Sequence, residues 1–304
     1  MKLLRVVAFV LIPVVCLGQR APSFTRADTA ALHRTLDSLA AAHHGIVGYT
    51  VHNLDTGERL SLRGDETFPT ASLIKVTVLV TLFDLVAHDS MSLDDPIIVQ
   101  HIDKVPGSGM LQYLHDNIEV TVRDAAFLMA TVSDNTATNL LLDKIGIRRV
   151  WAKTESLGLP HSKIHAKVFR RSTTTVAPDS STKYGLGVTT PNEMARLFEL
   201  LAQGQAVSPK ADSAMLDILS QNMKGDMLQR YVPDVRFAHK DGEDDDTRTE
   251  CGLFWLQSRV VVCALTKENQ DQRWLIDNEP QLLLANIGRA VASAWPRPAP
   301  PASK

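Results

Sequence analysis

The pattern of apolar and polar positions predicts strands near both ends of the chain and helices between them. Leucines recur at helical spacing within residues 25–44, which predicts an amphipathic helix. Residues 46–53 alternate apolar and polar side chains, a short turn follows, and residues 58–63 return, so this stretch predicts a β-hairpin. Three further strands are predicted near the C-terminus, at residues 235–240, 250–256 and 259–266.

The middle of the chain carries helical periodicity and helix-capping signals. Residues 76–86 are apolar on almost every side, which predicts a helix in the interior of the protein. Thr121 and Asp124 form the pattern of a capping box before a helix over residues 125–132. Further helices are predicted from Pro191 to Gly204, from Pro209 onward and over residues 280–295, and the proline-rich residues 297–304 are predicted to be a disordered tail.

Together these elements predict an α/β fold of the α+β type. An antiparallel sheet built from both termini would be flanked by helices, and an all-helical region would be inserted into it. We expect the α/β part to comprise residues 24–66 and 226–296, and the helical part to comprise residues 67–225. A functional site would lie in the seam between the two parts.

The N-terminus has the pattern of a targeting segment. Lys2 and Arg5 precede an apolar run that is too short to span a bilayer, so residues 1–18 are interpreted as a secretory signal peptide. Its removal takes away these two basic residues and no acidic ones, so the formal net charge changes from −2 to −4. Neither value favours nucleic acid or an anionic membrane as a partner. We expect a periplasmic or secreted monomer without a stable membrane anchor.

Two cysteines, Cys251 and Cys263, remain after such processing. The predicted strands 250–256 and 259–266 are joined by a tight turn, which would place the two cysteines nearly opposite each other. They would either form a disulfide or remain two buried free thiols, and the sequence leaves both alternatives open. An exported protein of this size does not depend on a disulfide framework.

Ser72 and Lys75 are the first candidate catalytic pair. They precede the apolar segment 76–86, and residues three apart share a helix face, so the lysine amine can lie beside the hydroxyl. A partly desolvated lysine can take the proton that a serine must lose to become a nucleophile. A helix N-terminus would add N–H groups suited to an oxyanion. Because this spacing often arises by chance, the pair requires partners elsewhere in the chain.

Two tripeptides supply such partners. Ser133-Asp134-Asn135 follows a predicted helix, and Lys240-Asp241-Gly242 ends a predicted strand. With Ser72 and Lys75, these signals resemble in order and separation the serine β-lactamase and penicillin-binding superfamily, and most closely the class A β-lactamases. The resemblance covers nearly the whole chain after residue 18 and also includes Phe68-Pro69 and Thr189-Thr190-Pro191.

The resemblance implies four catalytic residues. Ser72 would attack the substrate carbonyl and carry the acyl group, and Lys75 would accept the serine proton directly or through a water molecule. Ser133 would relay a proton to the leaving nitrogen. Lys240 would hold the Ser133 hydroxyl and supply positive charge, and Lys75 and Lys240 would lower each other's pKa if they are close.

The resemblance also implies a set of substrate-binding residues. Asn135 would offer its side-chain amide to a substrate amide, and Asp241 and Gly242 would line the substrate site. The backbone N–H groups of Ser72 and Glu243 would form an oxyanion hole, a role that tolerates many side chains. Asp134 is interpreted as a residue that ties helices together and not as a catalytic acid.

One departure from the family concerns release of the acyl group. Class A enzymes activate the deacylating water with a glutamate on the loop before the Thr-Thr-Pro helix. Residues 156–192 contain no glutamate, and their only carboxylate is Asp179. Acylation without a deacylating base would yield a long-lived covalent complex. Asp179 is the candidate substitute, and His161 and His165 are alternative bases.

The second departure is Asp241, where the family carries threonine or serine. An ionised aspartate cannot donate a hydrogen bond to a substrate carboxylate and would repel it by up to a few kcal/mol at ~4 Å. Pairing of Asp241 with Lys240 or Arg248 would soften this effect. The acidic residues 243–246 are interpreted as a solvated turn and not as a calcium site. Such an acidic rim would prefer neutral or cationic substrates.

These observations predict an exported active-site serine hydrolase that opens β-lactam amides through an acyl-enzyme on Ser72, with weak deacylation. One alternative is a D-peptidase or esterase acting on cell-wall-like or neutral acyl substrates. Another is a covalent penicillin-binding protein with little turnover. No metal or other cofactor is expected, because the ten histidines show no His-Glu-x-x-His or comparable spacing. The expected partner is a small-molecule substrate.

Overall fold

The structure, a computed structural model, describes residues 28–296 of the 304-residue chain. The predicted signal peptide, residues 1–18, and the predicted tail, residues 297–304, lie outside the described residues. No helix between residues 28 and 296 is both long enough and apolar enough to cross a membrane.

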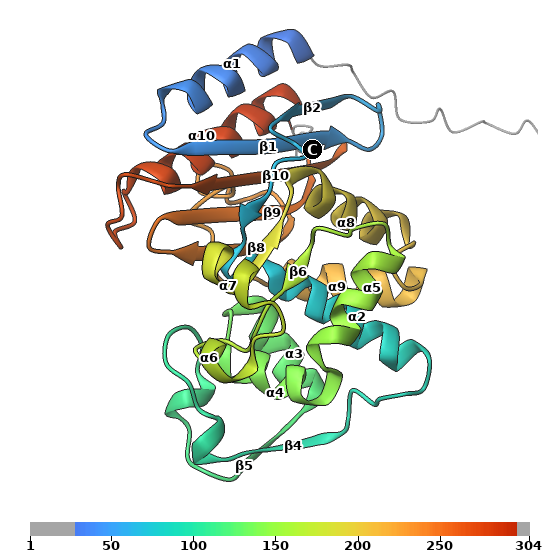
Figure 1. Ribbon diagram of the computed structural model, residues 1–304. Coiled ribbons are helices and arrows are strands. Elements are labelled where there is room, and N and C mark those ends of the chain that lie inside the picture. The colour runs from blue at the N-terminus through green and yellow to red at the C-terminus, as the bar shows by residue number, and fades with distance from the viewer. Residues whose placement is uncertain (1–27, 297–304) are drawn as a thin grey trace, which may run out of the picture.

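A five-stranded sheet takes its strands from the two ends of the described chain, in the order β2-β1-β10-β9-β8 (Figure 1). All neighbouring strands whose pairing is resolved run antiparallel. This arrangement confirms the α+β fold with a sheet built from both termini. The strands are β1 (Ile46–Asn53), β2 (Arg59–Leu62), β8 (Phe237–Asp244), β9 (Thr247–Trp255) and β10 (Arg259–Lys267).

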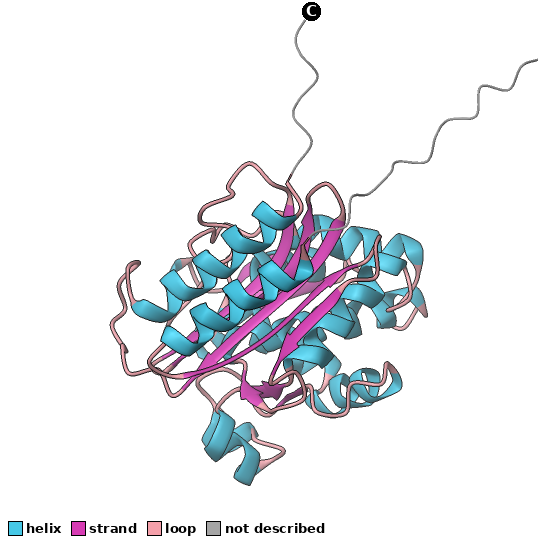
Figure 2. Ribbon diagram, turned by 90° about the horizontal axis from the view of Figure 1, so that it is seen from above, coloured by secondary structure: helices cyan, strands magenta, loops and turns pink. Residues whose placement is uncertain are grey.

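Both faces of the sheet are buried, and each covers its own hydrophobic cluster. Val260 and Val262 on β10 pack in the cluster beneath α1 (Thr29–Ala42) and α10 (Glu279–Ala294), while Val261 between them packs in the larger cluster on the opposite face. This alternation is the period of two that a strand imposes on its side chains. Helices α1 and α10 lie side by side across one face of the sheet, and other helices lie on the far side (Figure 1 and Figure 2).

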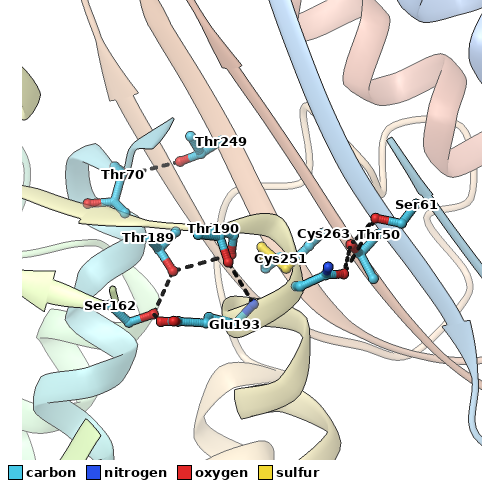
Figure 3. Close-up of a disulfide and its surroundings, with 11 residues drawn as sticks. Thr50, Ser61, Thr70, Ser162, Thr189, Thr190, Glu193, Thr249, Cys251 and Cys263 are labelled. Carbon is cyan, nitrogen blue, oxygen red and sulfur yellow. Dashed lines mark hydrogen bonds between the residues drawn. A yellow bond between two sulfur atoms is a disulfide. The ribbon is translucent and has the colours of Figure 1, made fainter. Parts of the chain in front are cut away.

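Cys251 and Cys263 are joined by a disulfide between the neighbouring strands β9 and β10 (Figure 3). The two residues lie directly opposite each other in the antiparallel register, as the predicted hairpin required. Both side chains are fully buried in the larger hydrophobic cluster. Of the two alternatives left open by the sequence, the structure has the disulfide.

The part of the chain between β2 and β8 is mainly helical and contains α2 at its centre. Nine consecutive residues of α2, from Lys75 to Phe83, are buried, which confirms the predicted interior helix. The helices of this part are α2 (Lys75–Ala87), α3 (Val122–Thr131), α4 (Asn135–Ile145), α5 (Ile147–Ser156), α6 (Arg171–Thr174), α7 (Pro178–Tyr184), α8 (Pro191–Gln203) and α9 (Pro209–Leu219), with 3-10 turns η1 (Ala71–Ile74), η2 (His101–Asp103) and η3 (Leu111–Tyr113).

Two small antiparallel sheets also lie within this predicted helical part. They are too short for a periodic sequence signal, since their strands contain two to four residues. The strands are β3 (Phe68–Pro69), β7 (Gly187–Thr189) and β6 (Lys163–Ile164) in one sheet, and β4 (Pro96–Val99) and β5 (Ile118–Thr121) in the other.

Helix starts follow the predicted capping signals. The Thr121 and Asp124 side chains each accept a hydrogen bond from the other residue's backbone N–H, which is the reciprocal capping box before α3. Thr190 caps α8, and Gly204 ends it in the left-handed conformation at φ 70°. Ser208 caps α9 in the same way as Thr190.

Strand β8 is longer than predicted at its C-terminal end. It continues past Lys240 to Asp244, so the turn reduces to Asp245 and Asp246 and the interpretation of residues 243–246 as a solvated turn is wrong for its first half. The physical reason is cross-strand pairing, because Glu243 lies opposite Arg248 on β9 and opposite charges stabilise such pairs.

Candidate active site

Ser72 lies in the 3-10 turn η1 and not in the first turn of an α-helix. The turn is fixed at Thr70, whose backbone N–H donates to Gly187 O at 3.0 Å and whose carbonyl accepts from Thr249 Oγ1 at 2.9 Å (Figure 3). Ala71, directly before Ser72, has the unfavourable positive φ of 44°. Ser72 itself is partly exposed and lines a pocket of about 200 Å³.

Gly242 allows strand β8 to pack against this turn. A Cβ atom at Gly242 would lie 2.2 Å from the carbonyl oxygen of Thr70 and 2.8 Å from the backbone nitrogen of Leu73. No side chain fits there, because both neighbours are backbone atoms. The glycine of the predicted Lys240-Asp241-Gly242 signal therefore brings the β8 backbone next to Ser72.

Lys75 reaches from α2 to the predicted Ser133-Asp134-Asn135 signal. Its Nζ atom lies 2.7 Å from Ser133 O, 3.1 Å from Ser133 Oγ and 2.8 Å from Asn135 Oδ1. The side chain is 1% exposed. The structure thus brings together three residues of the predicted site, Lys75, Ser133 and Asn135.

The environment of Lys75 favours a neutral amine. Burial, followed by the positive charge of Lys240, lowers the pKa of Lys75 well below its usual 10.5. A neutral amine has a lone pair with which to accept a proton, which is the property that the general-base role requires. The positive charge of Lys240 thus contributes to the lowered pKa of Lys75.

Ser133 is held in the left-handed region at φ 54° by its neighbour Asp134. One carboxylate oxygen of Asp134 accepts from the N–H of Ala137 and so caps α4, and the other accepts from the N–H groups of Met110 and Leu111. Asp134 therefore ties the start of η3 to the start of α4, in agreement with its interpretation as a residue that ties helices together. A strained residue persists only where its surroundings fix it in this way.

Lys240 has a different partner from the one that the resemblance implied. Its Nζ atom donates to Asp241 Oδ1 at 2.7 Å and to Asp241 O at 2.9 Å. Among the hydrogen bonds of residues 28–296, the Ser133 hydroxyl is paired with Lys75 and not with Lys240. The expectation that Lys240 holds the Ser133 hydroxyl is wrong here, because the carboxylate of the adjacent Asp241 competes for the ammonium group.

Arg248 is also engaged internally. Its guanidinium donates to Thr247 O at 2.8 Å and to Asp244 O, and it lies beneath the ring of Trp274. The side chain is 1% exposed. Arg248 stabilises the β8–β9 turn and does not present a free charge to the pocket.

The pocket beside Ser72 has a second wall that sequence reasoning missed. Val168 and Phe169 line it, and the main chain of Val168 is held on both sides by Asn139, which accepts from Val168 N at 2.8 Å and donates to Val168 O at 3.0 Å. Asn139 is four residues after Asn135 and lies on the same face of α4. This spacing was the available signal, but only the fold shows that its partner is Val168.

The three candidates for a deacylating base lie elsewhere or are already bonded. Asp179 is exposed in the first turn of α7 and does not line the pocket beside Ser72. His161 contacts Glu193 at 2.6 Å. His165 is buried between Ser180 Oγ and Gly185 O, and burial lowers its pKa. Val168, which has no ionisable group, occupies the pocket wall instead.

No group of three or more His, Cys, Asp or Glu side chains within residues 28–296 is arranged to hold a metal ion.

Comparison with known proteins establishes the family. The profile of the Beta-lactamase enzyme family matches residues 31–295. The chain belongs to that family. A β-lactamase-family protein is a hydrolase of small β-lactam molecules, and the family assignment confirms the resemblance found in the sequence.

Individual β-lactamase relatives agree with this assignment. A β-lactamase of Streptomyces cellulosae is 29% identical over 251 residues, which cover 80% of this chain and 78% of the relative. An ancestral class A β-lactamase has a similar structure, with a TM-score of 0.76 and 26% identity, over 86% of this chain and 99% of the other. A mutant of PBP-A, solved as an acyl-enzyme complex with penicillin-G, has a TM-score of 0.75 and 26% identity, over 90% and 98% of the two chains.

We predict that Gly242→Ala separates β8 from the Ser72 turn. The new Cβ would overlap the Thr70 carbonyl, so either strand or turn must move. We expect a loss of stability of about 1–3 kcal/mol in chemical denaturation and a fall in acylation rate of at least about tenfold. Gly225→Ala is the matched control, because its Cβ would meet only Gln229 Oε1 at 3.7 Å. Wild-type acylation by Gly242→Ala would contradict the close approach.

Proposed function

We propose that this β-lactamase-family protein is an exported active-site serine hydrolase that opens β-lactam amides through an acyl-enzyme on Ser72 and releases the acyl group slowly. The supporting observation is the buried amine of Lys75, which bonds to Ser133 and Asn135 one helical turn from Ser72. Nucleophile, base and proton relay are then contributed by two helices and their preceding turns. The signal peptide predicted from the sequence, which lies outside the described residues, supports export.

The acylation step follows from the protonation state of Lys75. A neutral Lys75 accepts the proton of the Ser72 hydroxyl while Ser72 Oγ bonds to the β-lactam carbonyl carbon. The N–H groups of Ser72 and Glu243 would stabilise the oxyanion. As the carbon–nitrogen bond of the ring breaks, the proton passes from Lys75 through the Ser133 hydroxyl, 3.1 Å away, to the leaving nitrogen. The site is then acylated at Ser72, and Lys75 is neutral again.

Deacylation would be slow, because the pocket wall formed by the loop before α8 lacks a carboxylate. Val168 occupies the pocket-lining position on the loop before α8, where class A enzymes place their deacylating glutamate. Asp179 is exposed on α7 and does not line the pocket. A water molecule beside the ester would thus have no base from this loop.

A covalent penicillin-binding protein with little turnover is the second candidate function. The similarity to PBP-A and the apolar Val168 favour it, since both are compatible with an acyl-enzyme that persists. A D-peptidase or esterase remains the alternative for substrates other than β-lactams. Comparison of nitrocefin, D-alanyl peptides and simple esters as substrates distinguishes these functions.

We predict that Ser72→Ala abolishes covalent modification by benzylpenicillin. Intact mass spectrometry of the wild-type protein should show an adduct of one penicillin per chain, and the variant should show none because the attacking oxygen is absent. Ser90→Ala, an exposed serine outside the pocket, is the control and should be acylated like the wild type. An adduct that persists in Ser72→Ala would exclude Ser72 as the nucleophile.

We predict that Val168→Glu accelerates loss of the acyl group. The Asn139 side chain holds the backbone of residue 168, so a glutamate there would face the pocket without a change in the loop. General-base catalysis is worth about 10²–10⁴-fold. The decay of the penicillin adduct measured by mass spectrometry should quicken by that order. Asp179→Asn should leave the decay unchanged, whereas a slower decay in this variant would identify Asp179 as the base.

The rate of acylation should rise with pH and level off well below pH 10.5. Lys75 must be neutral to act as a base, and its pKa is lowered by burial and by Lys240. The neutral fraction grows as the pH rises through this lowered pKa and is complete above it. Rapid-quench mass spectrometry at a fixed low penicillin concentration measures the profile. A rate that still increases at pH 10.5 would show that Lys75 has its ordinary pKa.

A further inference from the structure

The lysines beside the candidate active site are neutralised by carboxylates of the protein itself. Lys240 is buried, and two of the three N–H donors of its ammonium group are used by Asp241 Oδ1 and Asp241 O. Lys224 approaches the other oxygen of the same carboxylate, with Nζ 3.3 Å from Asp241 Oδ2. Asn222 adds a hydrogen bond of 3.3 Å to Asp241 Oδ1.

Asp241 is therefore a buried, ionised carboxylate with cations on both of its oxygens. The side chain is 3% exposed. Burial alone would raise its pKa, but the positive charges of Lys240 and Lys224 outweigh burial and hold the pKa of Asp241 well below its usual 3.8. Asp241 therefore carries a full negative charge at neutral pH.

Glu243, the next acidic residue along β8, also interacts with positively charged side chains. Glu243 bonds to Lys224 and lies 3.9 Å from Arg248 Nε. Lys224, Lys240 and Arg248 carry three positive charges, and Asp241, Glu243 and Asp244 carry three negative ones. This edge of the sheet thus offers no net positive charge to an anion.

The residues that line the pocket beside Ser72 likewise carry no net positive charge. The charged side chains among its lining residues are Arg171, Glu243 and Asp244, which give one positive and two negative charges. Arg171 and Asp244 bound the same corner, because a Cβ on Gly185 would lie 3.6 Å from Arg171 Nη1 and 3.7 Å from Asp244 Oδ2. The single guanidinium at the pocket therefore already has an acidic neighbour.

We propose that Asp241 places the protein's own carboxylate against Lys240 and Lys224, where an acidic substrate would otherwise bind, so that the site selects uncharged or cationic acyl compounds. Asp241 is in this sense a specificity-determining residue. This inference rests on the proposed acyl-enzyme function, because selectivity is read from the rate of acylation. Free β-lactam acids would be poor substrates, and their neutral esters better ones.

The expected selectivity is large enough to measure. Two free ammonium groups would attract the carboxylate of a β-lactam acid but not its neutral ester, an effect worth on the order of tenfold to a hundredfold in affinity. Because Asp241 already pairs with Lys240 and Lys224, the acid does not gain this attraction and meets the net negative charge of the pocket instead. The same two β-lactams share the ring and acyl side chain, so the ratio of their acylation rates isolates the effect of the charge.

The experiment compares benzylpenicillin with benzylpenicillin methyl ester, with acylation followed by intact mass. In the wild type we expect the ester to acylate faster than the acid, because the pocket lining carries a net negative charge. Asp241→Asn keeps the shape and frees the charge of Lys240 and Lys224, and should shift the ester-to-acid ratio towards the acid by on the order of tenfold or more. Asp245→Asn, in the exposed turn, makes the same change in net charge and should leave the ratio unaltered.

The outcomes separate this inference from the proposed function. If neither compound modifies the wild type, the acyl-enzyme function fails. If both modify it and the acid is equal or faster, the function stands and the selectivity by Asp241 is wrong. The wild-type ratio tests the inference even if Asp241→Asn folds poorly, which thermal denaturation would reveal. A folded Asp241→Asn protein with an unchanged ratio would also overturn it.

Discussion

The candidate site depends on a buried lysine amine at the centre of the molecule. Lys75 begins α2, the helix surrounded by the larger hydrophobic cluster, and its Nζ atom joins that helix to the start of α4. Burial of an ammonium group costs several kcal/mol unless hydrogen bonds or loss of the proton relieve it. The protein uses both means, since three oxygens surround the amine and its pKa is lowered. On the proposed mechanism, the burial that costs the fold free energy also prepares Lys75 to act as the base.

Much of the fold was predictable, because its signals are periodic or depend on capping. The apolar helix α2, the capping box at Thr121 and the opposed cysteines all follow from local patterns, and the structure has them. The short strands β3 and β6 and the 3-10 turn at Ser72 were not predictable, since two to four residues cannot show a period. Their positions are set by tertiary contacts such as that between Thr70 and Thr249.

The site was predictable where a motif fixes both identity and position. Lys75 contacts Ser133 and Asn135, two other residues of the predicted site, but Lys240 binds its own neighbour Asp241. A sequence motif identifies the residues of a site but does not show how their charges compete. Whether Lys240 binds Ser133 Oγ or Asp241 Oδ1 depends on burial and on Lys224, which comes from another part of the chain. Val168 was not predictable from a motif for the same reason. Its position in the pocket wall is set by the hydrogen bonds of Asn139 to its main chain and by the path of the loop before α8.

Two strained residues of the candidate site, Ala71 and Ser133, are compensated by the surrounding packing. Ala71 and Ser133 both have positive φ, which costs of order 1–3 kcal/mol each. The first is fixed by β8 and β9 through Thr70, and the second by Asp134 and its three backbone donors. The sheet and the helices thus hold the two hydroxyl-bearing turns in position.

The hydrogen bonds between Asn139 and the main chain of residue 168 have an evolutionary consequence. The Asn139 side chain bonds to the peptide N–H and C=O of residue 168, which every residue type other than proline provides, and it does not bond to the side chain of that residue. Selection can therefore exchange the amino acid at this position while the loop keeps its path. On the proposed chemistry, a lineage could pass between capturing an antibiotic and destroying it by one replacement, with no rebuilding of the scaffold.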